Sequence, residues 1–501
     1  MDTPVLIVGA GPVGLTLAMA LGRRGVPLRI IDKAAARTDK SKALVLWPRT
    51  LELLDIQACA QPFLDAGVKA SGARIVARQH MLVHLQFKNA RSVYPYALMI
   101  PQSETERVLE DQLASMGVQV ERNVELISFT DDGDSATAVL RSGDGRDETL
   151  ACAHLAGCDG AHSTTRHTVG ARFQGNTLPS DWMLADVIID GHIPHDELTI
   201  CWTPQGILAF FPIGTTRFRV IADLGHTTDT DAAAPTIDEV QQILDRRGPP
   251  GLQAHDPVWT SRFRINERKV GNYRHGRVFL CGDAAHVHSP AGGQGMNTGM
   301  QDAFNLAWKL ALVWHGHASP ALLDSYSPER SAVGDQVLRN AGTMTKVAIL
   351  RNPTLRAIRN TILGVLGKSP KLRQRMVDQL TELDIHYAKS PLTLKATGVA
   401  RHPACGERAP DLTLSSSENA ASSLHGMLAT GKFAVLSVAA NAVDLPDELH
   451  AIATAARVET APGYEAGHVY LIRPDAYVAA STQSNNTQVI IGVLKRIALN
   501  S

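Results

Sequence analysis

The sequence predicts an α/β protein built from three structural units, and three observations carry this prediction. A strand, a glycine-rich turn and a helix open the chain. Alternating strand-like segments then occupy residues 182–224, in the pattern of an antiparallel sheet. Strand-forming segments return after about residue 395, beyond a basic helical stretch over 353–387. The length of 501 residues also exceeds what one compact core accommodates.

The first element is a turn that suits a bound phosphate. A short apolar strand over 5–8 runs into a GxGxxG pattern, and a helix over 15–24 follows. Such glycines permit a tight turn and close backbone approach, while the helix N-terminus offers N–H groups to a pyrophosphate. The glycines of the pattern are Gly9, Gly11 and Gly14.

The second strand supports the same interpretation. It covers residues 28–31 and ends at Asp32 and Lys33, so that the acid lies 21 positions after Gly11. An acid at this point accepts hydrogen bonds from the ribose hydroxyls of a dinucleotide. The order therefore predicts a Rossmann-like dinucleotide site, with a glycine-rich turn of another α/β fold as the alternative.

Two later segments distinguish between dinucleotides. Residues 154–157 form a short strand that enters a turn at Asp159, where Ser163 is placed to cap the next helix. Further on, an apolar run ends in GDAAHVHSPAGGQGMN over 282–297. A nicotinamide dehydrogenase would usually continue as alternating strands and helices instead.

These motifs, in this order, resemble the single-component aromatic hydroxylases, flavoprotein monooxygenases related to p-hydroxybenzoate hydroxylase and phenol hydroxylase. The resemblance covers about residues 3–345, and a pattern of Gln102, Glu106 and Leu109 also fits it. It implies a Rossmann-like FAD-binding domain with an inserted antiparallel-sheet substrate domain and a C-terminal thioredoxin-like domain. The matching motifs are GAGPVG (9–14), CDGAHSTTR (158–166) and the 282–297 segment.

The resemblance also suggests domain boundaries. Because the third unit lacks a CxxC pair and holds Cys405 alone, we expect it to be structural or to support a dimer, not to cycle electrons. The expected units are 1–173 (first part of the FAD-binding domain), 174–270 (substrate-binding sheet), 271–394 (second part and connecting helices) and 395–501 (thioredoxin-like domain).

The resemblance implies contacts with FAD along the motifs. Asp283 is expected on the ribityl chain, and the helix that starts at Gly295 would stabilise negative charge on reduced flavin through its free N–H groups. Lys42 stands where the family commonly has arginine, which keeps the charge but loses the planar fork. The expected cofactor residues are Gly9, Gly11, Gly14, Asp32, Lys33, Lys42, Gln102, Asp159, Asp283, Gly293, Gly295, Met296 and Asn297.

Catalytic and substrate residues are expected in two places. Pro290, Gly295 and Asn297 are assigned to the reacting edge of the flavin. Apolar residues of the predicted sheet are assigned to the substrate pocket, with ordinary core packing as the alternative. These pocket residues are Trp202, Phe210, Phe211 and Pro212.

The implied reaction is hydroxylation of a phenolic or polyketide-type aromatic molecule. In such an enzyme NADPH or NADH reduces FAD, O2 forms a flavin C4a-hydroperoxide, and the distal oxygen passes to the ring. Baeyer–Villiger or other oxidative flavin chemistry is the main alternative, followed by non-catalytic flavin binding. The sequence does not identify the general base.

Composition bounds the partners. Lys+Arg and Asp+Glu are both 49, and this balance argues against nucleic acid or an anionic membrane as a partner. Six scattered cysteines and no signal-peptide pattern predict a cytoplasmic protein, either monomer or homodimer. His286 and His288 form an H-x-H pair near Asp283, for which loop capping is expected in preference to a metal site.

Overall fold

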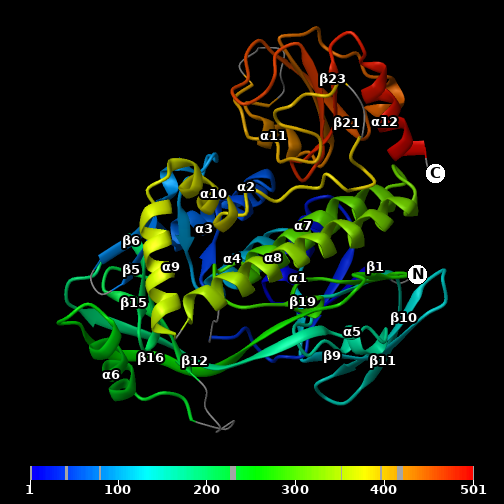
Figure 1. The fold of residues 1–501 in the computed structure, drawn as a ribbon. Helices are drawn as coiled ribbons and strands as arrows, with labels where there is room; N and C mark the ends of the chain where they lie inside the picture. The colour runs from blue at the N-terminus through cyan, green and yellow to red at the C-terminus, as the bar shows by residue number, and fades with distance from the viewer. Residues whose placement is uncertain are drawn as a thin grey trace.

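The computed structural model shows a two-part body with a separate C-terminal unit on top (Figure 1). Lys42, one of the expected cofactor residues, lies outside the part of the chain that the structure describes. In that part, no helix is both long and apolar enough to cross a bilayer. The described residues are 3–39, 43–77, 80–225, 233–350, 352–394, 398–414 and 421–499.

The first sheet carries the predicted glycine turn, with helices packed on one face and residues of the β9–β10 hairpin packed on the other. Five of its strands are parallel, in the order β18-β11-β1-β2-β8, with β17 and the β9–β10 hairpin added antiparallel. Helices α1 (Pro12–Gly22), α4 (Gln102–Ser115) and α7 (Gly295–Trp314) share its apolar core. The strands are β1 (Thr3–Val8), β2 (Leu28–Asp32), β8 (Val120–Arg122), β9 (Val124–Asp131), β10 (Ala136–Ser142), β11 (Asp147–Gly157), β17 (Arg274–His275) and β18 (Val278–Leu280).

The second sheet contains the strands predicted between residues 182 and 224, and it is mostly antiparallel. Its order is β19-β16-β12-β15-β14-β13-β5-β6, so three strands come from outside the expected 174–270 segment. Helix α6 (Ile237–Arg247) covers one face. The strands are β5 (Gly72–Ala77), β6 (His80–Gln86), β12 (Gln174–Asp190), β13 (Glu197–Thr203), β14 (Gly206–Pro212), β15 (Arg217–Gly225), β16 (Gln253–Lys269) and β19 (His286–Val287).

The C-terminal unit is built on a four-stranded mixed sheet, β21-β20-β22-β23. It forms the orange and red part at the top of Figure 1. Its thioredoxin-like character stays a prediction. Its elements are α11 (Leu424–Leu428), β20 (Phe433–Val438), β21 (Ala453–Val458), β22 (His468–Ile472), β23 (Val478–Gln483) and α12 (Gln488–Leu499).

Several shorter elements complete the body. The stretch predicted to be helical over 353–387 is two helices, because Ser369 caps a new helix by accepting from the backbone N–H of Leu372. A small sheet, β3-β7-β4, lies beside the first sheet's helices. These elements are β3 (Val45–Leu46), α2 (Pro48–Ile56), α3 (Ala60–Ala66), β4 (Val68–Ala70), β7 (Ala97–Met99), α5 (Thr164–Thr168), α9 (Pro353–Leu366) and α10 (Pro370–Leu380).

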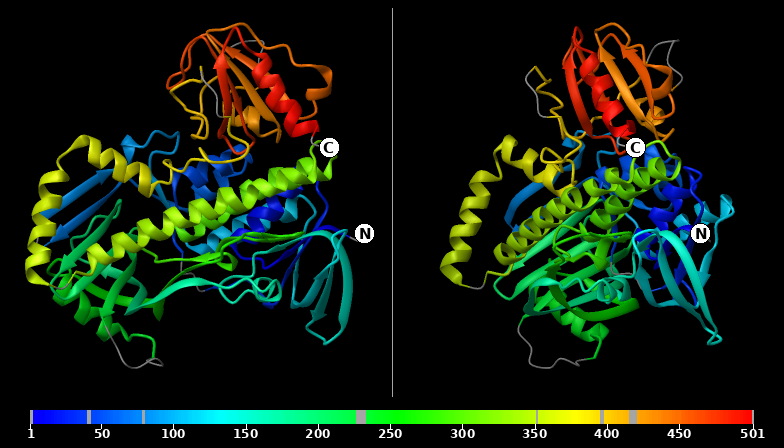
Figure 2. Two further views of the ribbon diagram at one scale, coloured as in Figure 1. Left: turned by 45° about the vertical axis from the view of Figure 1, so that its right-hand side comes forward. Right: turned by 90° about the vertical axis from the view of Figure 1, so that its right-hand side faces the viewer.

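Helix α7 has an unusual buried face. It lies beside α8 (Tyr326–Ala348), and both run beneath the C-terminal unit (Figure 2). Four of its buried polar residues recur at every fourth position, and Thr298 and Asp302 are buried beside them. Residues four apart lie on one side of a helix. The polar stripe consists of Asn297, Gln301, Asn305 and Lys309.

Candidate active site

The three sequence motifs meet at one edge of the first sheet. Parallel strands β1, β2, β11 and β18 all end there, and a ligand in an open α/β sheet binds at this carboxyl edge. Backbone bonds continue past the strand ends: Gly9 donates to Ile31 (2.8 Å), Cys158 to Val8 (2.8 Å) and Cys281 to Gly157 (3.0 Å). The motifs are therefore in contact although they lie far apart in the sequence.

The three glycines of the first turn differ in what surrounds them. Gly9 has φ +100°, and a Cβ there would lie 2.5 Å from the Cys158 carbonyl oxygen. A Cβ on Gly14 would lie 1.9 Å from the carbonyl oxygen of Gly9. A Cβ on Gly11, by contrast, would meet no atom within 4 Å. The fold itself requires Gly9 and Gly14, whereas Gly11 faces open space at the helix N-terminus.

Asp32 is bound to the turn that precedes it. Its Oδ2 accepts from the Ala10 N–H at 2.7 Å, and its Oδ1 accepts from the Ala34 N–H at 2.8 Å. Lys33 is exposed beside it. Gln102 begins α4, where its side chain donates to Glu106 at 2.9 Å. Asp32 therefore shapes the turn and still has lone pairs for a ribose hydroxyl.

Asp159 has one oxygen that the protein leaves open. Its Oδ2 accepts from the backbone N–H and the hydroxyl of Thr165, at 2.9 and 3.0 Å. Within the described residues, its buried Oδ1 has no partner. A buried carboxylate oxygen without a donor is unfavourable by roughly 1–3 kcal/mol, so such an atom indicates a ligand or water. The predicted cap is confirmed, because Ser163 accepts from the Arg166 N–H at 2.8 Å.

A buried carboxylate on α7 holds the GD segment, which begins at Gly282 and Asp283. Asp302 accepts from the Gly282 N–H at 2.9 Å, lies 2.9 Å from His286 Nε2 and accepts from Arg330 Nε at 2.5 Å. Burial alone would raise the pKa of Asp302, but the Arg330 guanidinium and the hydrogen bonds from His286 and the Gly282 N–H keep it below its usual value. Asp283 is left exposed at the carboxyl edge, and His286 serves the loop through Asp302.

The loop before α7 is fixed by one side chain. Asn297 Nδ2 donates to the carbonyl oxygens of Val45 (2.8 Å) and Gly293 (3.0 Å), while its Oδ1 accepts from the Trp47 N–H (2.9 Å). The Trp47 indole donates to the Gly292 carbonyl oxygen at 2.9 Å. Gly293 has φ +62°, and a Cβ there would lie 2.5 Å from Val45 Cγ1. The predicted catalytic residue Asn297 thus uses its side chain on the backbone of the loop.

The start of α7 has no side-chain cap. Its N-cap residue, Gln294, instead donates to the Gln379 carbonyl oxygen at 2.8 Å. Gly295, Met296 and Asn297 form the first turn, and Pro290 is exposed at the head of the loop. Uncapped N–H groups and the helix dipole make such a terminus attractive to an anion.

His288 is a second polar group at this loop. Its Nδ1 lies 2.8 Å from the Ser289 carbonyl oxygen, which only accepts, so Nδ1 carries the proton. Its buried Nε2 has no partner among the described residues, and Gly295 lies close to it. Burial, with the nearby His286, lowers the pKa of His288 to about 4. The ring is therefore neutral at pH 7.

The structure does not bring the four expected substrate residues together. Phe210 is fully buried in the core under α6, whereas its neighbour Phe211 is half-buried on the opposite face, since successive residues of a strand alternate. Trp202 belongs to a separate cluster, where the Arg359 guanidinium stacks 4.2 Å from its ring centroid. Pro212 is buried at the end of β14.

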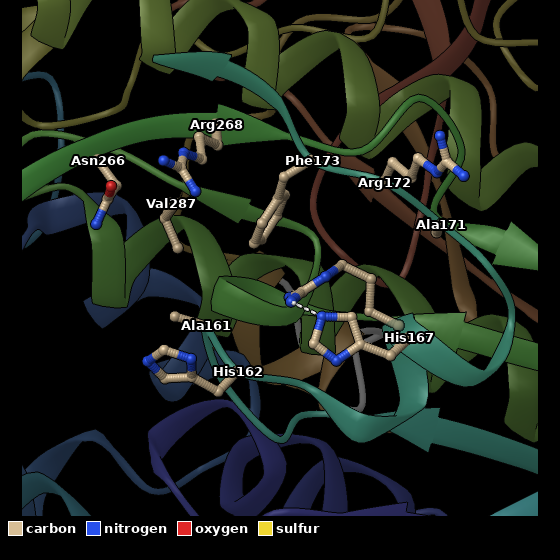
Figure 3. Close-up of a pocket in the computed structure, with 10 residues that line it drawn as sticks. Ala161, His162, His167, Ala171, Arg172, Phe173, Asn266, Arg268 and Val287 are labelled. Carbon is tan, nitrogen blue, oxygen red and sulfur yellow. Dashed lines mark hydrogen bonds between the residues drawn. The ribbon is translucent and has the colours of Figure 1, made fainter. Parts of the chain in front are cut away.

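A basic cavity of about 400 Å³ borders residues 158–166, the DG segment (Figure 3). Arg166 stacks 3.9 Å from the Phe173 ring centroid, and Arg268 donates to Thr177 at 2.6 Å. Sequence reasoning missed most of this lining, because about a hundred positions separate Arg268 from the DG motif and no local pattern joins them. The lining residues are Ala161, His162, Arg166, His167, Ala171, Arg172, Phe173, Asn266, Arg268 and Val287.

These features fit a bound dinucleotide flavin. The space at Gly11 accommodates a pyrophosphate against α1, the open oxygen of Asp159 has room for a donor, and the uncapped start of α7 suits an anionic ring edge. All of them lie at or beside one sheet edge. Sequence reasoning missed three residues that hold the loops of this edge in place. They are Trp47, Asp302 and Arg330.

Comparisons with known proteins agree with this geometry. A family model described as FAD binding domain matches residues 2–341, and one described as aromatic-ring hydroxylase, C-terminal, matches 402–498. An uncharacterized aromatic compound monooxygenase of Bacillus subtilis (strain 168) is 34% identical, over 96% of this chain and 94% of its own. The 6-methylpretetramide 4-monooxygenase of Streptomyces rimosus is 39% identical, over 78% and 71%. The structure of an anhydrotetracycline hydroxylase from Streptomyces rimosus superposes with a TM-score of 0.82 at 29% identity, covering 99% of both chains.

Proposed function

The chain belongs to the FAD-dependent aromatic-ring hydroxylases, and we propose that it uses NAD(P)H and O2 to hydroxylate a phenolic, polyketide-type substrate. The observation that carries this proposal is the meeting of the three motifs at the sheet edge, where polar groups are left open for a ligand. Two similar proteins are named for substrates of the tetracycline type, which supports the substrate class.

We assign FAD to the carboxyl edge of the first sheet. Gly11 would face the pyrophosphate, Asp32 the ribose, Asp159 a hydroxyl or amide donor, and Asp283 the ribityl chain. Gly9, Gly14 and Gly293 would support the same site by their backbone shape. When bound, FAD supplies the hydride acceptor and the oxygen-activating ring that amino acids lack.

The chain's own residues would position and shield that ring. Gly295, Met296 and Asn297 present backbone N–H groups, and the Asn297 side chain holds the loop at its angle. We therefore assign Asn297 a positioning role. Pro290, exposed at the head of the loop, would contact the reacting edge and limit access of water.

The substrate would lie between this loop and the second sheet. Phe211 faces that side and is only half-buried, so we keep it as a pocket residue. Phe210 points away, into the core under α6, and would support the wall from behind. Pro212 alternates to the same face as Phe210, and Trp202 packs in a separate cluster, so both would support the sheet and not line the pocket.

The basic cavity is the proposed site for NAD(P)H. Its cations suit phosphates, and the Phe173 ring and Val287 offer an apolar surface. Val287 lies on β19, directly before the loop that leads to α7. The cavity thus joins the DG segment to the proposed flavin edge, as hydride transfer requires.

Substrate-stimulated oxidation of NADPH or NADH tests the proposal. Purified, FAD-loaded protein is mixed with a panel of monocyclic phenols and polycyclic aromatic polyketides, while O2 uptake and product mass are followed. A product heavier by about 16 mass units indicates insertion of one oxygen atom. FAD-loaded protein that no member of the panel stimulates would contradict the proposal.

Arg268→Ala tests the cavity. Loss of one charge-assisted hydrogen bond of about 1.5–3 kcal/mol should raise KM for NADPH or NADH at least about tenfold. FAD content should stay unchanged. Arg141→Ala, which removes an exposed ion pair with Asp147 on the β10–β11 hairpin, is the control. An unchanged KM in Arg268→Ala would place the co-substrate elsewhere.

A further inference from the structure

A buried carboxyl group packs directly against the first two turns of α7. Glu382 lies just after α10, is 1% exposed and has φ +59°, a backbone conformation that is strained for glutamate. Its Oε1 accepts from the Thr298 hydroxyl at 3.0 Å, and its Oε2 lies 2.5 Å from the Gln301 side-chain nitrogen. Both partners belong to α7 and both are neutral.

Glu382 has no cation of its own. Among the described residues it takes part in no ion pair, and the guanidinium that acts on it electrostatically, that of Arg330, is bound to Asp302, Tyr387 and the Thr298 carbonyl oxygen. On the α2 side, the Arg49 guanidinium contacts Glu52 and the Asp475 carbonyl oxygen. Asp384, two residues along, adds a further negative group. The charged neighbours therefore leave a carboxylate at this position poorly compensated.

The local hydrogen bonds suit a protonated acid. Burial raises the pKa of Glu382 to about 8, despite the opposing effects of Thr298, Arg330 and Gln301. The Gln301 Oε1 atom is buried without a partner within the described chain. A half-turn of the Gln301 amide would let a protonated Glu382 donate to that oxygen, and 2.5 Å is a normal O–H···O separation.

We propose that Glu382 is a positioning residue that stays protonated, so that the first turns of α7 carry no negative charge beside the reduced, anionic flavin. This inference rests on the proposed function, which places the flavin ring at the start of α7. Glu382 contacts residues four and seven positions into that helix, so its carboxyl group lies within about 10 Å of the helix start, where the anionic flavin edge would bind. Two negative charges at that distance weaken binding of the anion about tenfold at an effective dielectric constant of about 20.

The protonation state is tested first without FAD. An acid with a raised pKa in the folded state contributes stability below its unfolded pKa, and this contribution is lost as pH rises through the folded value. The melting temperature of apo Glu382→Gln, relative to the parent apo protein, should therefore increase from about pH 5 to about pH 8 and then level off. If the difference in melting temperature between the two apo proteins does not change with pH, Glu382 is ionised and the proposal is wrong.

The effect on flavin is tested in the holoenzyme. The midpoint potential of bound FAD is measured from about pH 6.5 to about pH 9.5. It gives the ratio of the protein's affinities for reduced and oxidised flavin. Relative to Glu382→Gln, the parent protein should lose about tenfold in this ratio above pH 8, which is about 30 mV for a two-electron couple. Glu267→Gln, on β16 and facing α8, is the control and should follow the parent.

The two experiments separate the possible failures. If the apo proteins show the expected pH dependence but the potentials of Glu382→Gln and the parent coincide, the proposed electrostatic role is wrong. The variant Gly11→Val, purified in the same way, tests the proposed flavin site independently. Loss of FAD from this variant supports that site. A potential shift that Glu267→Gln shares would also overturn the assignment to Glu382.

Discussion

Two regions along α7 bury polar groups, and they differ in how these groups are paired. At the start of the helix, His288 Nε2 has no partner in the described chain and the helix lacks a side-chain cap, and on the nearby sheet edge Asp159 Oδ1 is likewise unpaired. Farther along, the C-terminal unit lies over the body (Figure 2). Charged side chains meet in ion pairs at this contact. In the open region at the start of the helix the unpaired groups suit a ligand, whereas the ion pairs of the closed region farther along join two parts of the fold.

The closed region is a network centred on Glu329. Its carboxylate accepts from Lys309 Nζ at 2.7 Å and from Arg473 Nη1 at 2.7 Å. Arg473 also pairs with Asp475 at 2.7 Å, and Arg408 pairs with Glu52 at 2.9 Å. Every one of these side chains is buried. Two of these ion pairs, Arg473–Glu329 and Arg408–Glu52, join the C-terminal unit to the body.

Breaking the closed region should have the largest effect on the fold. Glu329→Ala leaves the Lys309 and Arg473 charges buried without their shared partner, which is unfavourable by about 3–5 kcal/mol. Denaturant unfolding of the full-length protein measures the loss. Lys495→Ala, which breaks an exposed pair with Glu448, is the control and should cost at most about 1 kcal/mol. Similar losses in the two variants would show that the network adds no stability.

The open region should respond in ligand binding and not in folding. Gly11→Val places a side chain in the space at the α1 N-terminus, so FAD affinity should fall at least about a hundredfold, or about 2.7 kcal/mol, while the apo protein keeps its melting temperature. Flavin absorbance after desalting and apo thermal unfolding measure the two quantities. Gly14→Ala is the matched variant, since its Cβ would clash with the Gly9 carbonyl oxygen and destabilise the apo protein. Yellow, fully loaded Gly11→Val would place the cofactor elsewhere.

The smallest effect is expected at Cys405. It is the only cysteine of the C-terminal unit, and its sulfur lies 3.5 Å from the Ser481 hydroxyl, a contact that serine can retain. Burial raises the pKa of this thiol, which further reduces its reactivity. Turnover of Cys405→Ser should stay within about twofold of the parent, with and without reductant. A large loss of coupled hydroxylation at unchanged FAD content would assign the unit a catalytic role.

The sequence predicted the local parts of the fold well and the long-range ones poorly. The strand and turn around Gly9, the cap at Ser163 and the strands of the second sheet all follow from periodicity and capping rules. The inclusion of β5, β6 and β19 in the second sheet depends on pairing between distant segments, which no local pattern encodes. The third unit's thioredoxin-like fold remains a prediction.

The candidate active site shows the same difference between local features, which the sequence predicts, and long-range contacts, which it does not. Motif residues such as Asp159 and Asp283 could be named from the sequence, and they lie at one sheet edge. Asp302, Arg330 and Glu382 could not, because their roles arise only where α7 meets α8 and the segment after α10. The sequence of α7 did contain a signal for such contacts, because polar residues at four-residue spacing in a largely apolar helix indicate buried polar partners.

The polar stripe of α7 also constrains how the chain can vary in length. Asn297 holds the loop at one end, Lys309 enters the charge network at the other, and the two lie about 18 Å apart along the helix. Inserting or deleting one residue between them would turn one end by about 100° relative to the other. The partners at one end of the helix would then no longer meet their side chains. Functional homologues should therefore keep the residues equivalent to Asn297 and Lys309 twelve positions apart, while the lengths of their surface loops vary.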